Sequence, residues 1–291
     1  MCRWLAYYGD PIPIETLILR RQHSLIDQSL HSREGATTTN GDGFGVGWYS
    51  ELGGTPGLYK SIQPAWNDRN LRELAKHISS PLFFAHIRAS TGTAVQETNA
   101  HPFRHGRWLF MHNGMVREFP HVRRDLLFAI DPSLIPELEG SSDSEVLFHL
   151  ALTFGLEDDP LTAIERMVGF VEEVGHRHEV EYPIQMTIAT TDGEQIVAAR
   201  YSSEGQSRSL YFSTEAHALK AQHPDIEELQ ELSDETRAIV SEPLGDVVGA
   251  WNKVPESSIG VVRPGQDELY VFTPRSPQSD APEERVSLRP R

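Results

Sequence analysis

Hydrophobic and polar positions follow two different periods along the chain, and these periods predict the order of its elements. Short apolar and aromatic runs closed by Gly, Pro, Asn or Asp are typical of strands, whereas apolar residues spaced by three or four predict amphipathic helices. Predicted strands span residues 3–8, 82–88, 108–112, 185–190, 195–201, 209–213, 237–241, 257–262 and 268–273. Predicted helices span residues 14–21, 68–79, 118–130, 142–154 and 160–175, and residues 24–39 are expected to form a loop.

Length and composition fit one globular domain of enzyme size. The chain has 291 residues, of which 38% are hydrophobic, and this suffices to bury a core. It shows no repeat of the length found in solenoids or propellers. Residues 274–291 combine Pro, Ser and mixed charges with little apolar content. We therefore expect one domain over residues 2–273 and a disordered tail over 274–291.

The balance of charge argues against two classes of partner. Lys and Arg number 26 against 42 Asp and Glu, a formal net charge of -16, which repels nucleic acid and anionic membrane surfaces. No apolar run approaches the roughly 20 residues that span a bilayer. Asp10, Pro11, Pro13 and Glu15 interrupt any signal-peptide core. We expect a cytoplasmic protein that binds neither nucleic acid nor membranes.

Residues 40–49, with the sequence Asn-Gly-Asp-Gly-Phe-Gly-Val-Gly-Trp-Tyr, place glycine at every second position. The spacing differs from the G-x-G-x-x-G of dinucleotide-binding loops and from the P-loop. It predicts a turn that leads into a strand with one face free of side chains, where another group can approach closely. Asp42 is expected to cap that turn.

Cys2 is the only cysteine, and it directly follows Met1. If Met1 is removed, Cys2 carries both a thiol and the free amine of the chain. An α-amino group titrates at about 7.7–8.0 and a thiol at about 8.5, so the amine can accept the thiol proton near neutral pH. Taken alone, a single cysteine is more often a small buried hydrophobe.

Arg88 ends one predicted strand and the pair Asn113-Gly114 follows another, and each has an ordinary structural explanation as well as a chemical one. The Arg88 guanidinium suits bidentate capture of a carboxylate, although it could also be a solvated edge residue. Asn-Gly between apolar runs is a strong hairpin signal. Its side-chain amide and backbone N–H could equally hold an oxyanion.

Asp143 lies in the first turn of a helix that Ser142 and Glu145 begin as a capping box. The helix dipole alone favours an acidic residue there. A carboxylate fixed at a buried helix start can also receive a substrate ammonium. The thirteen histidines show no metal-ligand spacing, and no Gly-x-Ser-x-Gly motif is present, so we expect no metal and no cofactor.

Several spaced motifs coincide in this chain, and together they resemble the glutaminase domain of class II (N-terminal nucleophile) glutamine amidotransferases over roughly residues 2–260. These motifs are Met1-Cys2-Arg3, residues 40–47, His86-Ile87-Arg88 with Thr91, Asn99-Ala100-His101-Pro102, His112-Asn113-Gly114 and residues 142–145. The chain is most similar to the stand-alone group that includes the glutaminase-like subunit of the fungal glutathione-degrading complex and the γ-glutamyl hydrolase of ergothioneine synthesis.

The resemblance implies a four-layer αββα sandwich of the α+β class, which agrees with the predicted order of elements. It implies that Cys2 is the nucleophile and its freed amine the base. Asn113 and Gly114 would form the oxyanion hole, and Arg88 and Asp143 would hold the substrate α-carboxylate and α-ammonium. Thr91 would support the pocket. The implied reaction passes through a γ-glutamyl thioester on Cys2.

Gly92-Thr93 follows Thr91, where synthetase-fused members commonly have His-Gly. The loop over the substrate is therefore expected to differ, which leaves room for a leaving group larger than ammonia. Three functions stay open at this point: a hydrolase of glutamine or a glutathione-like γ-glutamyl compound, a glutaminase subunit with a protein partner, or a catalytically silent binding module.

Overall fold

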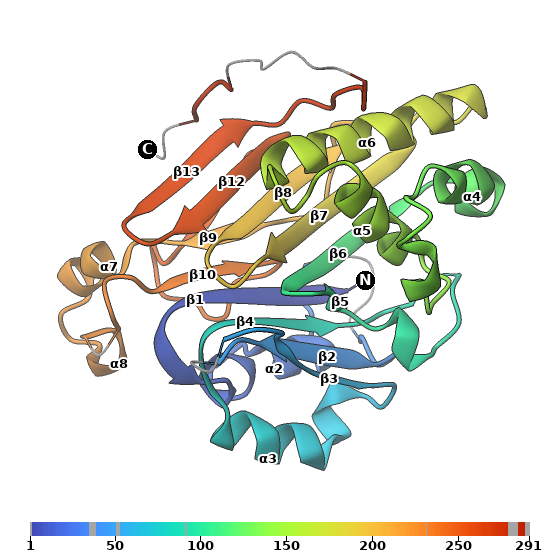
Figure 1. The fold of residues 1–291 in the computed structure, drawn as a ribbon. Helices are drawn as coiled ribbons and strands as arrows, with labels where there is room; N and C mark the ends of the chain where they lie inside the picture. The colour runs from blue at the N-terminus through green and yellow to red at the C-terminus, as the bar shows by residue number, and fades with distance from the viewer. Residues whose placement is uncertain are drawn as a thin grey trace.

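The computed structural model describes residues 2–34, 39–50, 53–90, 92–230, 232–278 and 285–288. These residues form two antiparallel sheets that lie face to face, with helices on the outer side of each (Figure 1). The predicted four-layer αββα sandwich of the α+β class is confirmed.

The seven-stranded sheet has the order β11-β9-β10-β1-β4-β2-β3 in the described residues. Its strands are β1 (Arg3–Pro13), β2 (Phe44–Trp48), β3 (Gly57–Ser61), β4 (Ser79–Ile87), β9 (Tyr211–Ser213), β10 (Arg237–Val240) and β11 (Trp251–Lys253). β1 pairs with β4 on one side and with β10 on the other, so that Leu5 lies opposite both Ala85 and Val240. The N-terminal strand is thus an interior strand of its sheet.

The six-stranded sheet has the order β13-β12-β8-β7-β6-β5. Its strands are β5 (Phe103–His105), β6 (Trp108–Val116), β7 (Ile184–Thr191), β8 (Ile196–Ser202), β12 (Ser258–Arg263) and β13 (Gln266–Val271). A turn at Asp192-Gly193 joins β7 to β8, with Gly193 at φ 92°. The Asp192 carboxylate accepts the backbone N–H of Glu194 at 2.9 Å and so fixes this turn.

Helices cover the outer faces of both sheets (Figure 1). α1 (Glu15–Ile18), α2 (Leu25–Leu30), η1 (Ala65–Asn67) and α3 (Arg69–His77) lie on the side of the seven-stranded sheet. α4 (Phe119–Phe128), α5 (Asp143–Thr153) and α6 (Pro160–Arg177) lie on the side of the six-stranded sheet. The remaining short helices are η2 (Glu97–Asn99), η3 (Ile135–Glu137), α7 (Ala216–Gln222) and α8 (Glu227–Gln230). Asp68, Ser142 and Asp159 cap α3, α5 and α6 through their side chains.

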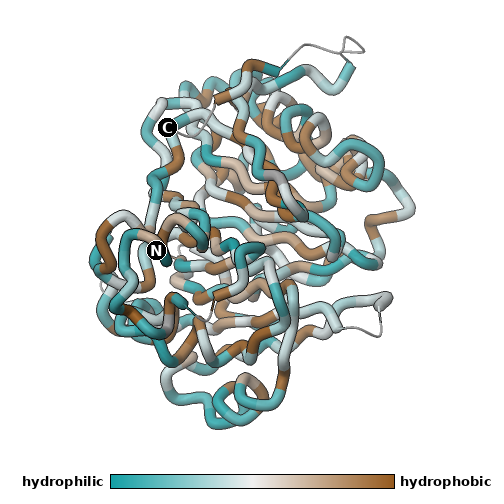
Figure 2. The backbone as a smooth tube through the Cα atoms, turned by 90° about the vertical axis from the view of Figure 1, so that its left-hand side faces the viewer, coloured by the Kyte–Doolittle hydropathy of each residue, from teal (hydrophilic) through white to brown (hydrophobic). Residues whose placement is uncertain are grey.

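Successive residues of the central strands belong to different layers of the core. Trp4 and Phe84 pack between the two sheets, whereas Leu5 and Phe83 pack beneath the helices of the seven-stranded sheet. A third cluster, which includes Phe110 of β6, lies under α5 and α6. Figure 2 shows hydrophobic stretches along the strands in the interior of the molecule. Because both faces of these strands are buried, they appear in the sequence as continuous apolar runs.

The predicted loop over residues 24–39 is wrong in part, because it contains α2. Ser24 begins this helix by accepting the backbone N–H of Asp27 at 3.2 Å, and Leu25 and Ile26 are buried. The helix is too short to show helical periodicity in the sequence. The short elements β3, β5, β11, α7 and α8 were missed for the same reason.

Asn113-Gly114 does not form a hairpin, although the dipeptide is typical of one. β6 continues through both residues to Val116 and pairs with β7 along its length. The partner strand begins 68 residues later in the chain, at Ile184, so tertiary pairing overrides the local turn signal. Asn113 therefore lies inside a sheet.

The described parts of the predicted tail lie against α6 and β13. Arg275 and Arg285 both pair with the buried carboxylate of Glu165, at 2.8 and 3.2 Å. Val271 and Leu269 exchange backbone hydrogen bonds with residues 286 and 288. Charge and backbone pairing hold this segment, and neither is visible in a hydrophobicity pattern.

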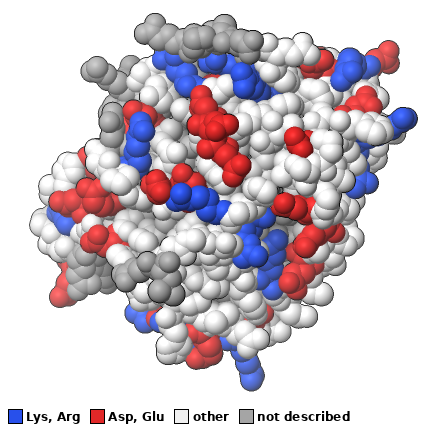
Figure 3. Space-filling model, in the orientation of Figure 1, with Lys and Arg blue, Asp and Glu red and all other residues white. Residues whose placement is uncertain are grey.

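Acidic and basic side chains are interspersed on the face shown in Figure 3. Within the described residues, no helix has both the length and the apolar character needed to cross a membrane.

Candidate active site

Cys2 directly precedes β1 and lies where the two sheets meet. Its thiol Sγ accepts the backbone N–H of Ala89, just after β4, at 3.4 Å. Its carbonyl oxygen accepts the side-chain amide of Asn113, from β6 of the other sheet, at 2.9 Å. The thiol is half-buried. Cys2 is thus in contact with Ala89, after a strand of one sheet, and with Asn113, in a strand of the other sheet.

The surroundings of the thiol disfavour its charged form. Burial raises the pKa of the Cys2 thiol, while the N–H of Ala89 and the positive charge of Arg88 lower it and Asp143 raises it further. The net effect is a raised pKa. Cys2 is therefore mostly a neutral thiol near pH 7, and a base that removes its proton would increase its reactivity.

Arg88 follows β4 and is buried, with 4% of its surface exposed. Its Nη2 donates to Thr93 Oγ1 at 2.7 Å and to Ser90 Oγ at 3.3 Å, whereas its Nη1 is buried without a partner in the described structure. Burial lowers the pKa of Arg88, and the nearby groups Cys2, Asp42 and Asp143 oppose this effect. A buried guanidinium with an open donor is suited to an anionic ligand.

Asp42 connects the glycine-rich segment to the loop that follows Arg88. Its carboxylate accepts the backbone N–H of Ser90 at 2.8 Å. The predicted close approach at the alternating glycines is confirmed, since a Cβ on Gly45 would lie 2.2 Å from the carbonyl oxygen of His101. His101 and Pro102 thus lie against a strand face without side chains, and Asp42 at the start of this segment holds the loop after Arg88.

Asp143 lies at the start of α5, as predicted, and faces the end of β6. Its two carboxylate oxygens accept the backbone N–H groups of Val116, at 2.9 Å, and of Ser144, at 2.8 Å. The predicted capping box forms only in part. Ser142 accepts the N–H of Glu145, but the Glu145 carboxylate accepts the N–H groups of Glu139 and Gly140 instead.

Gly114, which follows Asn113 in β6, has no room for a side chain. A Cβ at this position would lie 1.9 Å from the carbonyl oxygen of Gln185 and 2.6 Å from His112 Nε2. The same glycine that weakens a strand in general is therefore required here by close backbone approach.

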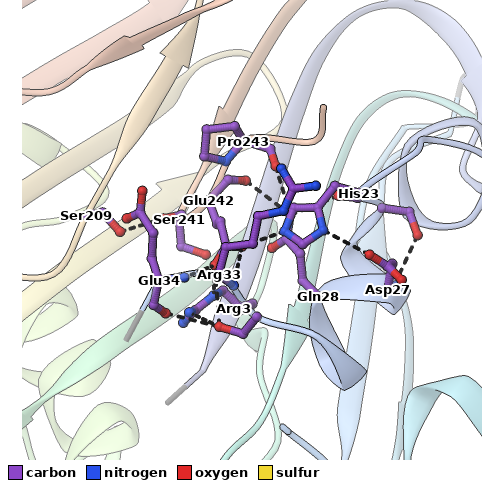
Figure 4. Close-up of polar contacts among 12 residues, drawn as sticks. Arg3, His23, Asp27, Gln28, Arg33, Glu34, Ser209, Ser241, Glu242 and Pro243 are labelled. Carbon is purple, nitrogen blue, oxygen red and sulfur yellow. Dashed lines mark hydrogen bonds and ion pairs between the residues drawn. The ribbon is translucent and has the colours of Figure 1, made fainter. Parts of the chain in front are cut away.

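A buried polar network, which the sequence did not reveal, holds Arg3 against Glu242 (Figure 4). Arg3 Nε donates to the Glu242 carboxylate at 2.8 Å, and Arg3 Nη1 donates to the carbonyl oxygen of Cys2 at 3.0 Å. His23 Nε2 lies 2.5 Å from the other Glu242 oxygen, which also accepts the backbone N–H of Arg33 at 2.8 Å. Burial alone would raise the pKa of Glu242, but these hydrogen bonds and the Arg3 charge lower it overall.

Three buried histidines lie near the site. The ring of His86 packs against that of His101, tilted by 30° with centroids 4.1 Å apart, and His86 Nε2 lies 3.3 Å from the carbonyl oxygen of His112. Burial lowers the pKa of His86 to about 3 and also lowers those of His101 and His112. All three are therefore neutral at pH 7.

The structure brings together Cys2, Arg88, Asn113, Gly114 and Asp143, the predicted site residues that it describes. Thr91 lies outside the described residues. In the described ranges, no group of three or more His, Cys, Asp or Glu side chains is arranged to hold a metal ion. Arg3 and Glu242 were missed because they are 239 residues apart and Glu242 lies in no recognisable motif.

Comparison with known proteins gives consistent matches. The family described as class II glutamine amidotransferases matches residues 21–286. The probable glutamine amidotransferase DUG3 of Saccharomyces cerevisiae is 35% identical, over 94% of this chain and 87% of that protein. The γ-glutamyl-hercynylcysteine sulfoxide hydrolase of Mycolicibacterium smegmatis is 25% identical, over 94% of this chain and all (100%) of that protein.

Two solved structures share the fold. A glutamine aminotransferase class-II domain protein from Silicibacter pomeroyi superposes with a TM-score of 0.72 at 33% identity, covering 94% of this chain and 100% of the other. Glutamine phosphoribosylpyrophosphate amidotransferase from Bacillus subtilis superposes with a TM-score of 0.63 at 16% identity, covering 95% of this chain and 50% of the other. The latter similarity concerns the fold alone.

Proposed function

Because the chain belongs to the class II glutamine amidotransferase family, we propose that it hydrolyses the γ-glutamyl amide bond of glutamine or of a glutathione-like γ-glutamyl compound. The observation that carries the proposal is the position of Cys2. Its thiol lies at the junction of the two sheets, beside a buried arginine with an open donor and a carboxylate at a helix start.

The proposed roles follow from the charges of a γ-glutamyl substrate. The α-carboxylate pairs with Arg88, and the α-ammonium pairs with Asp143, whose oxygens keep acceptor capacity beyond their two backbone partners. The γ-carbonyl then lies at Cys2. Asn113 and the backbone N–H of Gly114 stabilise the oxyanion, and Thr91 supports the pocket.

In the first half of the reaction, Cys2 Sγ bonds to the γ-carbonyl carbon, and the thiol proton passes to the α-amine of Cys2. The carbon–nitrogen bond then breaks, and the leaving amine takes up that proton. Water attacks the resulting thioester, releases glutamate and restores the thiol. A base within the same residue is consistent with the raised pKa of the thiol, which leaves little thiolate without one.

The proposal requires Cys2 to carry the free amino group of the chain, and it requires a reduced thiol. Cys2 is a free cysteine in the structure. We propose the cytosol as the compartment on this ground, since thiols stay reduced there.

A substrate panel tests the proposal. Glutamine, glutathione and simple γ-glutamyl amides are incubated with the wild-type protein and with Cys2→Ala, and glutamate release is measured. Intact-mass measurement of the same sample establishes whether Cys2 is the first residue. We expect glutamate release by the wild type only. Absence of release from every γ-glutamyl amide, by a protein whose first residue is Cys2, would contradict the proposal.

The same panel addresses the role of a protein partner. A stand-alone hydrolase releases glutamate at full rate by itself. A subunit that delivers ammonia to a separate synthetase would instead act weakly, prefer glutamine and be stimulated by a protein that co-purifies with it.

A further inference from the structure

Arg208 lies near the nucleophile, between β8 and β9, in a segment with fixed ends. Ser207 donates its hydroxyl to the Glu256 carboxylate at 2.6 Å, and Ser209 donates its hydroxyl to the carbonyl oxygen of Ser241 at 2.8 Å. Leu210 is completely buried. Arg208 is therefore flanked on both sides by anchored residues, which hold its backbone in place.

The side chain of Arg208 has no protein partner in the described structure. It is half-buried, its Nε is fully buried without a hydrogen-bond partner, and its guanidinium makes no ion pair with a described residue. An unpaired, partly desolvated guanidinium is costly. It is also unexpected in a chain with 42 acidic and 26 basic residues.

Hydrogen bonds place Arg208 near Cys2, because the neighbouring Ser209 bonds to Ser241, whose backbone N–H donates to the carbonyl oxygen of Trp4 at 3.1 Å, two residues after Cys2. Burial lowers the pKa of Arg208, the neighbouring charge of Arg3 lowers it further, and Cys2 raises it. Arg3 is itself paired with Glu242, at 2.8 Å. Arg208 is thus the guanidinium on this side of the thiol that has no carboxylate partner in the described residues.

Arg88 and Arg208 lie on different sides of β1. Arg88 directly follows β4, which pairs with one edge of β1, whereas Ser209, the residue after Arg208, bonds to Ser241, which directly follows β10 on the other edge. Cys2 precedes β1 and so lies between them. With the amino-acid head of a substrate at Arg88 and its scissile amide at Cys2, the leaving group extends toward the side of Arg208.

We propose that Arg208 binds a carboxylate on the leaving group, so that the preferred substrates are γ-glutamyl amino acids or peptides and not glutamine. The inference rests on the proposed function and adds the class of substrate to it. A γ-glutamyl amino acid carries one carboxylate on each side of the scissile amide. Within the part of the chain that the structure describes, the site offers one guanidinium without a carboxylate partner on each side of the thiol. The positive charge near the leaving group also offsets the net charge of -16 that opposes an anionic substrate.

Two substrates that differ by one carboxylate provide the test. γ-Glutamylalanine and γ-glutamylethylamide share the γ-glutamyl group and a two-carbon chain on the amide nitrogen, and only the former carries a carboxylate there. We expect the wild type to favour γ-glutamylalanine. Arg208→Gln should lower kcat/KM for γ-glutamylalanine by about 10- to 100-fold, mainly through KM, and leave that for γ-glutamylethylamide unchanged. Arg208→Lys should recover part of the loss.

Arg263→Gln is the matched control, because Arg263 is an exposed arginine paired with Glu268 on the surface. Arg263→Gln should leave kcat/KM unchanged for both substrates. Equal loss on both substrates by Arg208→Gln, or no loss on γ-glutamylalanine, would overturn the role of Arg208 while leaving the hydrolase intact. If the wild type released glutamate from glutamine but not from γ-glutamylalanine, only the role of Arg208 would be overturned. Failure on glutamine and on every other γ-glutamyl amide would overturn both proposals.

Discussion

Asn113 joins the six-stranded sheet to the nucleophile, since its amide donates to the carbonyl oxygen of Cys2 at 2.9 Å. If this amide also stabilises the oxyanion, its removal should affect kcat more than KM. We expect Asn113→Ala to lower kcat by about 10²- to 10³-fold, the cost of losing one oxyanion donor. Steady-state kinetics with the best substrate of the panel measure this loss in kcat. Asn252→Ala, which removes an exposed amide bound to Thr214, should leave kcat unchanged.

Glu242 is the centre of a buried charge network, and its replacement should be costly. Glu242→Gln keeps the size of the side chain but leaves the buried Arg3 guanidinium without a counter-ion. We expect the free energy of unfolding to fall by about 3 kcal/mol, as for other broken buried pairs. Urea unfolding measures this change.

A double variant distinguishes the loss of the Arg3–Glu242 ion pair from a change in side-chain packing. Arg3→Met combined with Glu242→Gln leaves no unpaired charge. The double variant should therefore lose less free energy of unfolding than the two single variants lose together. Glu194→Gln breaks the exposed pair with Arg107 and should change stability by less than about 0.5 kcal/mol. Strict additivity of Arg3→Met and Glu242→Gln would contradict the coupling.

Residues with a local signal could be predicted from the sequence, and residues without one could not. Cys2 is the only thiol, Arg88 follows a buried strand, and Asp143 lies one position after a helix cap. Glu242 and Arg208 lie in no motif, and Arg3 belongs to one without a role that the motif reveals. The positions of Glu242 and Arg208 near Cys2 depend on strand pairing across more than 200 residues, which periodicity does not encode.

At the scale of elements, β6 shows what local propensity leaves undetermined. Asn-Gly predicts a turn, but here it continues a strand, because a close backbone approach at Gly114 matters more than turn preference. The long elements with clear periodicity were predicted correctly, including β4, β7, α5 and α6. The short elements α2, β3, β5 and β11 have too few residues to show a period, and they form through pairing and packing with distant parts of the chain.

Gly114→Ala tests this close approach. Its Cβ would lie 1.9 Å from the Gln185 carbonyl oxygen, so that β6 and β7 must shift apart. We expect a loss of about 1–3 kcal/mol in the free energy of unfolding and a loss of activity, since Asn113 moves with the strand. Gly245→Ala is the control because its Cβ meets no atom within 4 Å. A stable and fully active Gly114→Ala protein would show that this approach is not required.

At the scale of the whole molecule, the buried neutral histidines make stability depend on pH. The pKa of His86 is lowered to about 3 and that of His101 is lowered as well, whereas both titrate near 6.5 in the unfolded chain. Below pH 6.5 the unfolded state binds protons on these two histidines that the folded state does not bind. Stability is therefore complete above about pH 6.5 and falls on acidification, by at most about 1.4 kcal/mol per pH unit for each histidine.

His101→Phe isolates one of these contributions. Neither ring nitrogen of His101 has a hydrogen-bond partner in the described residues, and its ring packs against His86 and Phe103. Phenylalanine can therefore occupy the site. We expect urea unfolding between pH 7.5 and 5 to show a shallower loss of stability than in the wild type, while His121→Gln, at an exposed histidine, leaves the slope unchanged. An unaltered slope in His101→Phe would contradict the assignment.

The interior position of β1 has a consequence for how the protein matures. β1, which Cys2 directly precedes, is synthesised more than 200 residues before its neighbour β10 (Arg237–Val240), and the carboxylate that pairs with Arg3 belongs to Glu242. During synthesis β1 therefore lacks one of its two neighbouring strands until residue 240 has emerged. A chain that ends before residue 237 should keep an intact Cys2 but have no organised site around it.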